Sequence, residues 1–435
     1  MNILIKNAFI ITVNENNEVL ENSNICISQG IIESIGEVPV DFDADKIIDA
    51  TYRIVMPGLV NSHTHLPMTL FRNYADDLPF WEWLTGKIKP AEDYLSAEHV
   101  YWGAKIGILE LIQSGVTCFS DMYFYMNEVA KVSDESGIRA IVSGILMDVG
   151  VSGKNYMKST LDFYDNWHGK AEGRINAIFG PHSIYLCSPE YLKEISDEVK
   201  KRDSIIHIHL SESRKEIDDA NEKFGKTPVQ HLEELGLLEC KIAAAHCVHV
   251  TDDEIQILRN NKVNVLNIPT SNLKLGNGFA PVSSFLSNGL NVALGTDGAS
   301  SNNNLNLFEE MHLASILNKV VSEDPESLNA KTIIRMATIN GATALGLGKE
   351  IGSIEIGKRA DLIMLDIHKT HFFPRNNLVS AIVYSAQASD VRTVLVNGKI
   401  LMEDYDVKTI NQEETIYKSE QMAFDLIRRT QNISN

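Results

Sequence analysis

The stretch that decides the fold of this chain is Pro57-Gly58-Leu59-Val60-Asn61-Ser62-His63-Thr64-His65. Leu59 to Asn61 is predicted to form the end of a buried strand, and side chains two residues apart on a strand point to the same side. His63 and His65 therefore converge on one point, and imidazole is the commonest protein ligand for metal ions. A His-x-His pair also recurs by chance in loops, so this stretch alone leaves a polar loop open as the alternative.

Apolar, strand-like runs alternate with helical stretches through the middle of the chain. Helices are predicted over 97–114, 189–201, 228–235 and 252–260, the last after the capping-box pattern Thr251-Asp252-Asp253-Glu254. A further helix is expected over 330–345. Eight βα units over roughly 250–300 residues describe an α/β fold, the (β/α)8 or TIM barrel. The predicted strands cover residues 59–65, 116–122, 139–146, 175–182, 205–210, 242–246, 263–268 and 292–297.

Both ends of the chain are rich in short β-type segments. In residues 1–57, short apolar runs are separated by Asn-rich and Gly-containing turns, and a similar texture returns over 361–366 and 391–398. Neither end has enough strands for a stable sheet with a buried face. We therefore expect one small β-sandwich domain built from residues 1–57 and 353–435, and a barrel domain over 58–352.

The composition is typical of a globular protein in a reducing compartment. The chain has 435 residues, of which 44% are hydrophobic and 22% charged, and its net charge of −19 argues against a nucleic-acid polymer or an anionic membrane as partner. No apolar run approaches the roughly 20 residues of a membrane span, and the alternating segment 1–7 differs from a signal sequence. The five cysteines include no C-x-x-C pair, so we expect buried free thiols and a cytoplasmic protein.

Polar residues gather at the C-terminal ends of the predicted strands, which form the active-site face of a barrel. Any one of them alone is more often a satisfied core residue, but the set as a whole follows the strand ends and predicts a site. The set consists of His63, His65, Asp121, His182, His207, His209, Glu212, His246, His249 and Asp297.

Three imidazoles and one carboxylate around a divalent ion, with one position left for water, make a hydrolytic centre. His63 and His65 supply two ligands. His209 is a better third ligand than His207 because it lies at the strand terminus, and core packing is the role expected of His207. Asp297 is the natural fourth ligand, and a carboxylate there can also take a proton from the attacking water. The alternative for Asp297 is a helix N-cap.

These residues resemble the amidohydrolase superfamily over essentially the whole chain, in particular the branch that includes the 5-methylthioadenosine/S-adenosylhomocysteine deaminases and the triazine hydrolases. The motifs are highly specific for the superfamily and less specific for a substrate. They are the segment 57–65, His209-Leu210-Ser211-Glu212, Ala245-His246-Cys247, Gly295-Thr296-Asp297-Gly298 and the tail 352–362.

The resemblance implies one divalent metal ion per chain, with His63, His65, His209 and Asp297 as its ligands. Zinc is the expected ion, and iron and manganese also suit these ligands. Binuclear relatives usually carry a carboxylated lysine at the end of the fourth strand, where this chain has Gly180-Pro181-His182. The resemblance therefore favours a mononuclear site.

The resemblance also assigns roles to the other polar residues. Glu212 would be the proton shuttle, and His246 would hydrogen-bond the attacking water. Glu92 and His182 match the substrate-binding residues of the family, and Glu212 and Asp297 would also contact the substrate. Without the resemblance, Glu92 is equally a solvated carboxylate at a helix start.

The implied reaction is the deamination of a purine nucleoside, with 5-methylthioadenosine the expected substrate and S-adenosylhomocysteine or adenosine as alternatives. Relatives that accept S-adenosylhomocysteine tend to carry arginines after the third strand, suited to its carboxylate. Residues 143–156 contain no arginine, and Lys154 and Lys158 are the nearest cations. Aromatic residues in the loop 76–84 either stack on the purine or fix the loop to the barrel.

Two other interpretations fit the same motifs. The first is a hydrolase of another amino-heterocycle, such as guanine, cytosine or a triazine. The second is a non-catalytic barrel scaffold, which would have lost ligands that this chain retains. A homo-oligomer is compatible with the sequence.

Overall fold

The computed structural model describes residues 1–150 and 155–431, and its centre is a barrel of parallel strands. Two parallel sheets form the wall, one with the order β10-β8-β7-β6 and with β9 on β8, the other with the order β11-β12-β13-β14. The strands are β6 (Leu59–Thr64), β7 (Val116–Tyr123), β8 (Arg139–Leu146), β9 (Ile175–Ala177), β10 (Gly180–Pro181), β11 (Ile205–Leu210), β12 (Lys241–His246), β13 (Asn264–Asn267) and β14 (Val292–Leu294).

Two seams join these sheets into a ring. At one seam, the amide of His207 on β11 donates to the carbonyl of Phe179, which lies between β9 and β10. At the other, the amides of Thr296 and Asp297, just after β14, donate to the carbonyl of His63 on β6. The eight predicted strands are thus confirmed, with the fourth divided into β9 and β10. Strands β7, β8 and β11 are buried along their whole length, as expected of parallel strands covered on both faces.

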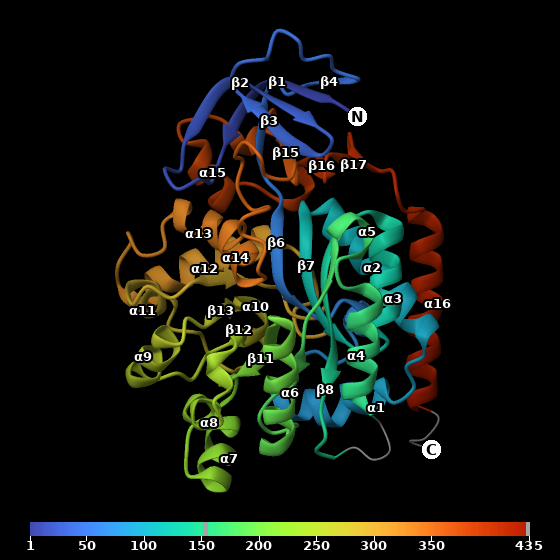
Figure 1. The fold of residues 1–435 in the computed structure, drawn as a ribbon, viewed down its shortest axis with the longest axis vertical. Coiled ribbons are helices and arrows are strands. Elements are labelled where there is room, and N and C mark those ends of the chain that lie inside the picture. Colours follow the sequence, from blue (N-terminus) through green and yellow to red (C-terminus); the bar gives the residue numbers. More distant parts are fainter. Residues whose placement is uncertain (151–154, 432–435) are drawn as a thin grey trace.

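Helices surround the barrel wall (Figure 1). The helices predicted over 97–114, 189–201, 228–235 and 252–260 are present within a residue or two of their expected bounds, and α9 begins with the predicted capping box at Thr251. The helices that follow the barrel strands include α2 (Ala97–Gln113), α3 (Met126–Ser136), α4 (Tyr156–Trp167), α6 (Pro189–Arg202), α7 (Arg214–Phe224), α8 (Pro228–Glu234), α9 (Asp252–Asn260), α10 (Pro269–Lys274), α11 (Val282–Ser287) and α12 (Leu307–Ser322).

The single helix expected over 330–345 is wrong, because the chain forms α13 (Ala330–Met336) and α14 (Ile339–Ala344) instead. Thr338 lies between them with φ −135° and ψ −97°, outside the helical region. The carbonyl of Ala337 accepts a hydrogen bond from the amide of Val60 on β6. In a continuous helix this carbonyl would accept from an amide of the next helical turn, so its bond to β6 accompanies the break between α13 and α14.

Both chain ends build one nine-stranded sheet with the order β18-β17-β16-β15-β5-β1-β2-β3, and β4 pairs with β1. The sheet folds over itself and brings Gly30, between β2 and β3, against Asn397, between β16 and β17. The approach is so close that a Cβ added to Gly30 would lie 2.4 Å from the carbonyl oxygen of Asn397. Its strands are β1 (Ile3–Ile11), β2 (Val19–Ser28), β3 (Ile31–Ile35), β4 (Lys46–Asp49), β5 (Arg53–Pro57), β15 (Leu362–Asp366), β16 (Val391–Val396), β17 (Lys399–Glu403) and β18 (Asp406–Val407).

Apolar residues from both ends of the chain share one core inside this folded sheet, as the predicted sandwich requires. The last helix, α16 (Gln412–Gln431), leaves the sheet and lies along α2 of the barrel (Figure 1), where the Ser419 hydroxyl donates to the carbonyl of Trp102 at 2.9 Å. The division of the chain into 1–57 with 353–435 and 58–352 stays a prediction.

A buried ion pair joins the barrel to the small sheet. The Arg139 guanidinium at the start of β8 donates through Nε to Asp361 Oδ2 at 2.8 Å, and both side chains are 1% exposed. The amide of Asn397 donates to the other oxygen of Asp361 at 2.7 Å. Because both charges are satisfied within the protein, this contact fixes the sheet at the N-terminal end of the barrel strands.

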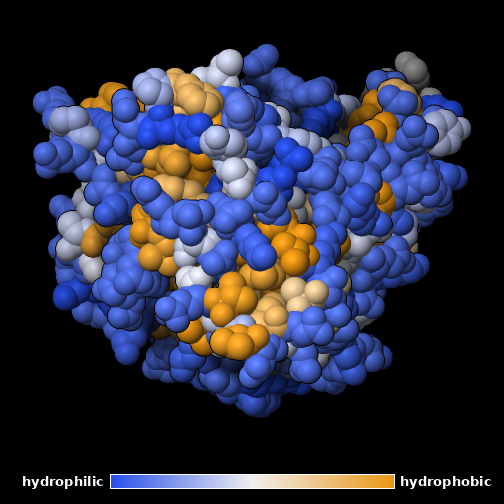
Figure 2. Space-filling view, turned by 90° about the horizontal axis from the view of Figure 1, so that it is seen from above, coloured by the Kyte–Doolittle hydropathy of each residue, from blue (hydrophilic) through white to orange (hydrophobic). Residues whose placement is uncertain are grey.

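The surface of the small sheet is mostly hydrophilic, with hydrophobic residues in several separate groups (Figure 2). Across residues 1–150 and 155–431, no helix is long and apolar enough to cross a membrane. The prediction of buried free thiols is confirmed for all five cysteines.

Candidate active site

Four ligand atoms converge at the C-terminal end of the barrel. His65 Nε2 lies 3.2 Å from His209 Nε2, and Asp297 Oδ1 lies 3.5 Å from His63 Nε2 and 3.3 Å from His65 Nε2. Two donors that are each about 2.1 Å from one ion, at a tetrahedral angle, lie about 3.4 Å apart. These spacings fit a small divalent ion. His63, His65 and Asp297 form one group of candidate ligands, and His63, His209 and His246 form a second group that shares His63.

The other nitrogen of each ligand imidazole is held by the protein. His65 Nδ1 is 2.6 Å from the carbonyl of Met122, and His209 Nδ1 is 2.7 Å from the carbonyl of His182. A carbonyl only accepts, so both Nδ1 atoms carry the proton and both Nε2 atoms present a lone pair. His63 Nδ1 is 2.7 Å from Nε2 of His207, which fixes the third ring.

At the centre of the site, hydrogen-bond acceptor atoms of the histidines lie next to one another with no donor from the described residues between them. The Nε2 atoms of His65 and His209 both present lone pairs at 3.2 Å, so they cannot share a hydrogen bond. His63 Nε2 is buried without a hydrogen-bond partner among the described residues. A buried group of lone pairs is costly unless something positive satisfies them, and a divalent cation does so for every member.

The charges of these groups also suit a cation. Burial lowers the pKa of His63 to about 4 and the pKa of His209 well below its ordinary value, so both imidazoles are neutral at pH 7. Burial opposes ionisation of Asp297, but the nearby His63 and His65 rings, whose Nε2 atoms lie 3.5 Å and 3.3 Å from Oδ1, outweigh it and hold the pKa of that carboxyl well below its usual value. Neutral imidazoles with a carboxylate are the protonation states that metal binding needs.

Hydroxyl and amide donors orient Asp297. Its Oδ2 accepts from the Ser271 hydroxyl at 2.6 Å and from the Ser301 hydroxyl at 2.8 Å, and its Oδ1 accepts from the amide of Gly298 at 2.8 Å. Asp297 itself has φ +64°, a left-handed conformation uncommon outside glycine. These contacts aim one carboxylate oxygen at the histidines.

His246 and Glu212 form the next group around the same point. His246 Nε2 lies 3.8 Å from Glu212 Oε2, its Nδ1 is 2.7 Å from the side-chain oxygen of Asn272, and Glu212 Oε1 accepts from Asn277 Nδ2 at 3.1 Å. Burial and the nearby charge of Asp297 raise the pKa of Glu212 well above its ordinary value. This upward shift of the pKa favours the protonated form of Glu212, the form that a general acid needs.

Glu92 and His182 border this group. Glu92 lies in the short helix α1 (Lys89–Glu92), and its Oε1 accepts from the Tyr123 hydroxyl at 2.7 Å. Burial raises the pKa of Glu92 to about 7 and lowers that of His182 to about 3. The ring of His182 lies 4.5 Å from the ring of His209, which places it beside a predicted ligand.

Aromatic residues of the loop 76–84 divide into two kinds. Phe80 and Trp83 are buried and stack on each other, with ring centroids 6.0 Å apart, so they fix the loop to the barrel. Trp81 packs edge-on against Tyr185 at 5.4 Å, and Tyr185 contacts His182 at 5.8 Å. Of these three aromatic residues, Trp81 is the one that contacts Tyr185, which in turn contacts His182.

Two of the predicted strand-end residues, Asp121 and His249, make hydrogen bonds that hold the main chain. Asp121 accepts from the amide of Leu66 at 2.5 Å and anchors the loop after β6, and the amide of His249 donates to the carbonyl of Ser211. Lys158 lies in α4, whereas Lys154 lies outside the described residues.

Sequence reasoning missed the residues that hold the site. His207 is more than a packing residue, because it bonds to His63 and to the Ser120 hydroxyl. Asn272 and Asn277, which hold His246 and Glu212, come from the polar run after β13, and that run was the available signal.

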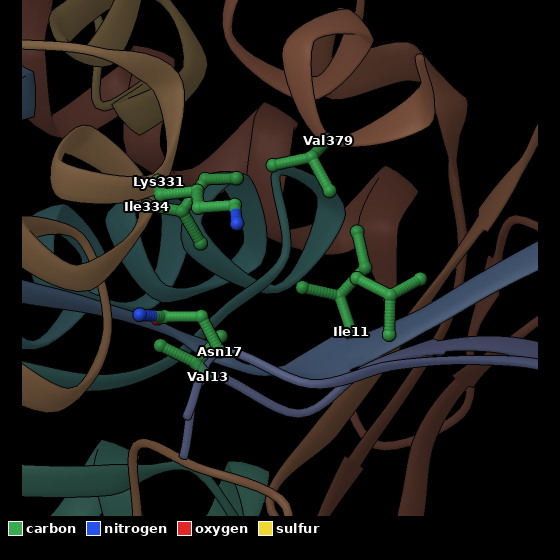
Figure 3. A pocket seen from close by; sticks show the side chains of 7 residues that line it. Ile11, Val13, Asn17, Lys331, Ile334 and Val379 are labelled. Atoms are coloured by element: carbon green, nitrogen blue, oxygen red, sulfur yellow. The ribbon is translucent and has the colours of Figure 1, made fainter. Parts of the chain in front are cut away.

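A separate cavity of about 10 Å³ lies between β1, α13 and α15 (Leu378–Tyr384), about the size of one water molecule (Figure 3). Its lining includes Ile11, Val13 and Ile334, and it contains none of the strand-end residues. This cavity is too small and too apolar to be a substrate site.

Comparisons with known proteins show which family this chain resembles. Residues 54–401 match the model of the amidohydrolase family. The 5-methylthioadenosine/S-adenosylhomocysteine deaminase of Thermoanaerobacter pseudethanolicus is 49% identical over 431 residues, which is 99% of this chain and 100% of the relative. The protein of the same name from Caldanaerobacter subterraneus is 50% identical over 98% of this chain and 99% of its own length.

Solved structures give the same picture. An adenosine deaminase from Xanthomonas campestris with bound zinc superposes with a TM-score of 0.94 at 31% identity, covering 98% of both chains. A zinc complex of atrazine chlorohydrolase from Arthrobacter aurescens has a TM-score of 0.91 at 23% identity, over 97% of this chain and 100% of its own, and supports the fold alone.

Proposed function

Because this chain belongs to the amidohydrolase family, we propose that it hydrolyses the amino group from an adenine nucleoside thioether. The substrates are 5-methylthioadenosine and S-adenosylhomocysteine, and the products are the inosine derivative and ammonia. Two lines of support are the names of full-length relatives at 49% and 50% identity and the bound zinc of the adenosine deaminase neighbour. The observation that carries the proposal is the acceptor-only cluster of His63, His65, His209 and Asp297 beside Glu212, a carboxyl whose pKa is raised by burial.

We assign one divalent ion, zinc, to this cluster. The donor set of three imidazole nitrogens and one carboxylate oxygen fits a metal that keeps one position for water. When bound, the ion supplies Lewis acidity, lowering the pKa of water from 15.7 toward about 7. His182 stands where a binuclear relative has a carboxylated lysine, which supports one ion rather than two.

Each side chain then has a task in the displacement of ammonia by water. Glu212 protonates the ring nitrogen next to the amino-bearing carbon, which makes that carbon a better electrophile. Asp297 takes a proton from the attacking water, and His246 accepts a hydrogen bond from it and orients it. The new C–O bond forms, the proton held by Asp297 passes to the amino group, and the C–N bond breaks to release ammonia. The remaining hydroxyl proton returns to Glu212, and the proton that Glu212 donated stays on the ring nitrogen of the product. No electron is gained or lost by the substrate.

Glu92 and His182 would bind the substrate at the rim of this group. Both are partly buried, and Glu92 is held by the Tyr123 hydroxyl, so each offers a fixed polar contact. Within the described part of residues 143–156 there is no arginine to pair with the homocysteine carboxylate. We therefore propose 5-methylthioadenosine as the preferred substrate.

A panel of amino-heterocycles tests the proposal. Purified protein loaded with zinc is incubated with 5-methylthioadenosine, S-adenosylhomocysteine, adenosine, guanine, cytosine and an aminated triazine, and ammonia is measured with chromatography of the product. We expect ammonia and an inosine derivative from the adenine nucleosides. Release from guanine, cytosine or the triazine alone would replace the proposed substrate class.

A further inference from the structure

Two buried glutamates occupy the same position in two neighbouring helices. Glu216 is the third residue of α7, after the N-cap Ser213, and Glu254 is the third residue of α9, after the N-cap Thr251. Their exposed fractions are 2% and 1%. The sequence patterns Ser-x-x-Glu and Thr-x-x-Glu both predict a capping box, in which the glutamate bonds back to the N-cap amide.

Only Glu254 makes that bond. Its Oε2 accepts from the amide of Thr251 at 2.7 Å, whereas Glu216 reaches past its N-cap to the turn before the helix. Glu216 Oε1 accepts from the amide of Ser211 at 3.1 Å, and Oε2 accepts from the amide of Glu212 at 2.8 Å. One carboxylate therefore fixes two successive peptide units at the end of β11.

This turn needs such support. Ser211 has φ +51°, a left-handed conformation that residues other than glycine, asparagine and aspartate rarely adopt. The turn carries Glu212 immediately after it, and His209 two residues before it. A rotation of the peptide between Ser211 and Glu212 would swing the Glu212 carboxyl away from His246, which it meets at 3.8 Å.

We propose that Glu216 is a positioning residue for the deamination, acting through the main chain of Ser211 and Glu212 to aim the Glu212 carboxyl at the substrate. This inference rests on the proposed function only for its kinetic consequence, since the two amide contacts are independent of the substrate. At this turn Glu216 accepts from the amides of Ser211 and Glu212, and the amide of His249 donates to the carbonyl of Ser211. Asn277 is the partner of the Glu212 side chain. The two contacts together leave the carboxyl one orientation.

The test compares Glu216→Gln with Glu254→Gln as the matched control. Glutamine keeps the size of the side chain, but its NH2 group turns a donor toward one of the two amides, so one contact is lost. A displacement of about 1 Å at a reacting group costs up to about 100-fold in rate. We expect kcat of Glu216→Gln to fall about 10- to 100-fold, while KM, bound metal and the melting temperature match those of Glu254→Gln.

A double-mutant cycle separates positioning from general damage. If Glu216 acts through Glu212, the variant Glu212→Gln/Glu216→Gln is no slower than Glu212→Gln alone. Multiplicative losses in the double variant, or a kcat of Glu216→Gln equal to that of Glu254→Gln, would overturn the proposal. If Glu216→Gln does not fold, Glu216→Asp, which keeps the charge but is one methylene shorter, takes its place in the cycle.

Hydrogen exchange supplies a readout that does not need activity. The amides of Ser211 and Glu212 are expected to exchange faster in Glu216→Gln than in the wild type, and at the wild-type rate in Glu254→Gln. Unchanged exchange in Glu216→Gln would refute the contact. If the wild type shows no deaminase activity but the two variants show the expected exchange rates, the proposed function is refuted and the contact between Glu216 and the two amides is supported.

Discussion

Replacing Glu212 by Gln tests the proton shuttle most directly. Glutamine has the same shape, and its oxygen can keep the hydrogen bond from Asn277, now 3.1 Å from Glu212 Oε1. Because this contact is retained, the cost in the free energy of unfolding should be within about 1 kcal/mol. The amide cannot donate an acid proton to the ring nitrogen, so the loss should appear in the chemical step.

The expected magnitude follows from general acid–base catalysis, which typically contributes about 10²–10⁴-fold. This range corresponds to about 2.7–5.4 kcal/mol in the activation free energy, at about 1.36 kcal/mol for each tenfold change. The pH dependence has a defined sign. Burial raises the pKa of Glu212, so wild-type kcat should fall as the pH rises above that raised pKa, and the Gln variant should lack this alkaline limb.

The assay combines ammonia release at saturating 5-methylthioadenosine with elemental analysis of the same samples. We expect kcat to fall by at least 10²-fold, bound metal to stay at the wild-type level, and an inosine-type product analogue still to bind. A near-normal kcat would refute the shuttle. Loss of metal together with activity would instead show that Glu212 is a ligand.

Four other changes probe the same site. His63→Ala or His209→Ala should strip the ion, and elemental analysis of the wild type should find close to one divalent ion per chain; two tightly bound ions would contradict the mononuclear assignment. His207→Leu, which removes the contact to His63, should weaken metal affinity about 10- to 100-fold in a chelator competition, and unchanged affinity would refute that role. Burial raises the pKa of Glu92 to about 7, so kcat/KM should rise with pH through that value if the ionised form binds substrate, and Glu92→Gln should abolish this limb. For the wild type, kcat/KM for 5-methylthioadenosine should equal or exceed that for S-adenosylhomocysteine, by tenfold or more if a bidentate contact of roughly 1.5–3 kcal/mol is missing; the reverse order would require a cation elsewhere.

The barrel could be predicted from the sequence because its strands are apolar along their whole length and end in polar residues. His63 and His65 show this best. His63 lies in β6 and His65 directly follows it, and the period of two of an extended chain predicts that both rings point to the same side. The rule that parallel strands expose their C-terminal ends on one face then brings in His209 and Asp297, which lie more than a hundred residues further along the chain.

The supporting contacts could not be predicted, because they depend on tertiary distances. Ser213 to Glu216 and Thr251 to Glu254 have the same local pattern, yet only the second pair forms a capping box. The chain direction after β11 decides which amides Glu216 meets, and no local pattern encodes that direction. The break between α13 and α14 has the same origin, because Val60 of β6 takes a carbonyl from the expected helix.

The candidate ligands also connect the two parallel sheets of the barrel. His63 belongs to β6 in one sheet and His65 directly follows that strand. His209 lies near the end of β11 in the other sheet, and Asp297 follows β14 of that second sheet. The backbone contacts across this seam include two amides donating to the carbonyl of His63. An ion bound by all four side chains would join the sheets where their backbone pairing is interrupted, and it would also remove the repulsion between the lone pairs of His65 and His209. Such an ion would couple metal binding to barrel closure, because a ligand that binds only the folded state adds RT ln(1 + [L]/Kd) to stability, about 4.1 kcal/mol at a thousandfold excess over Kd.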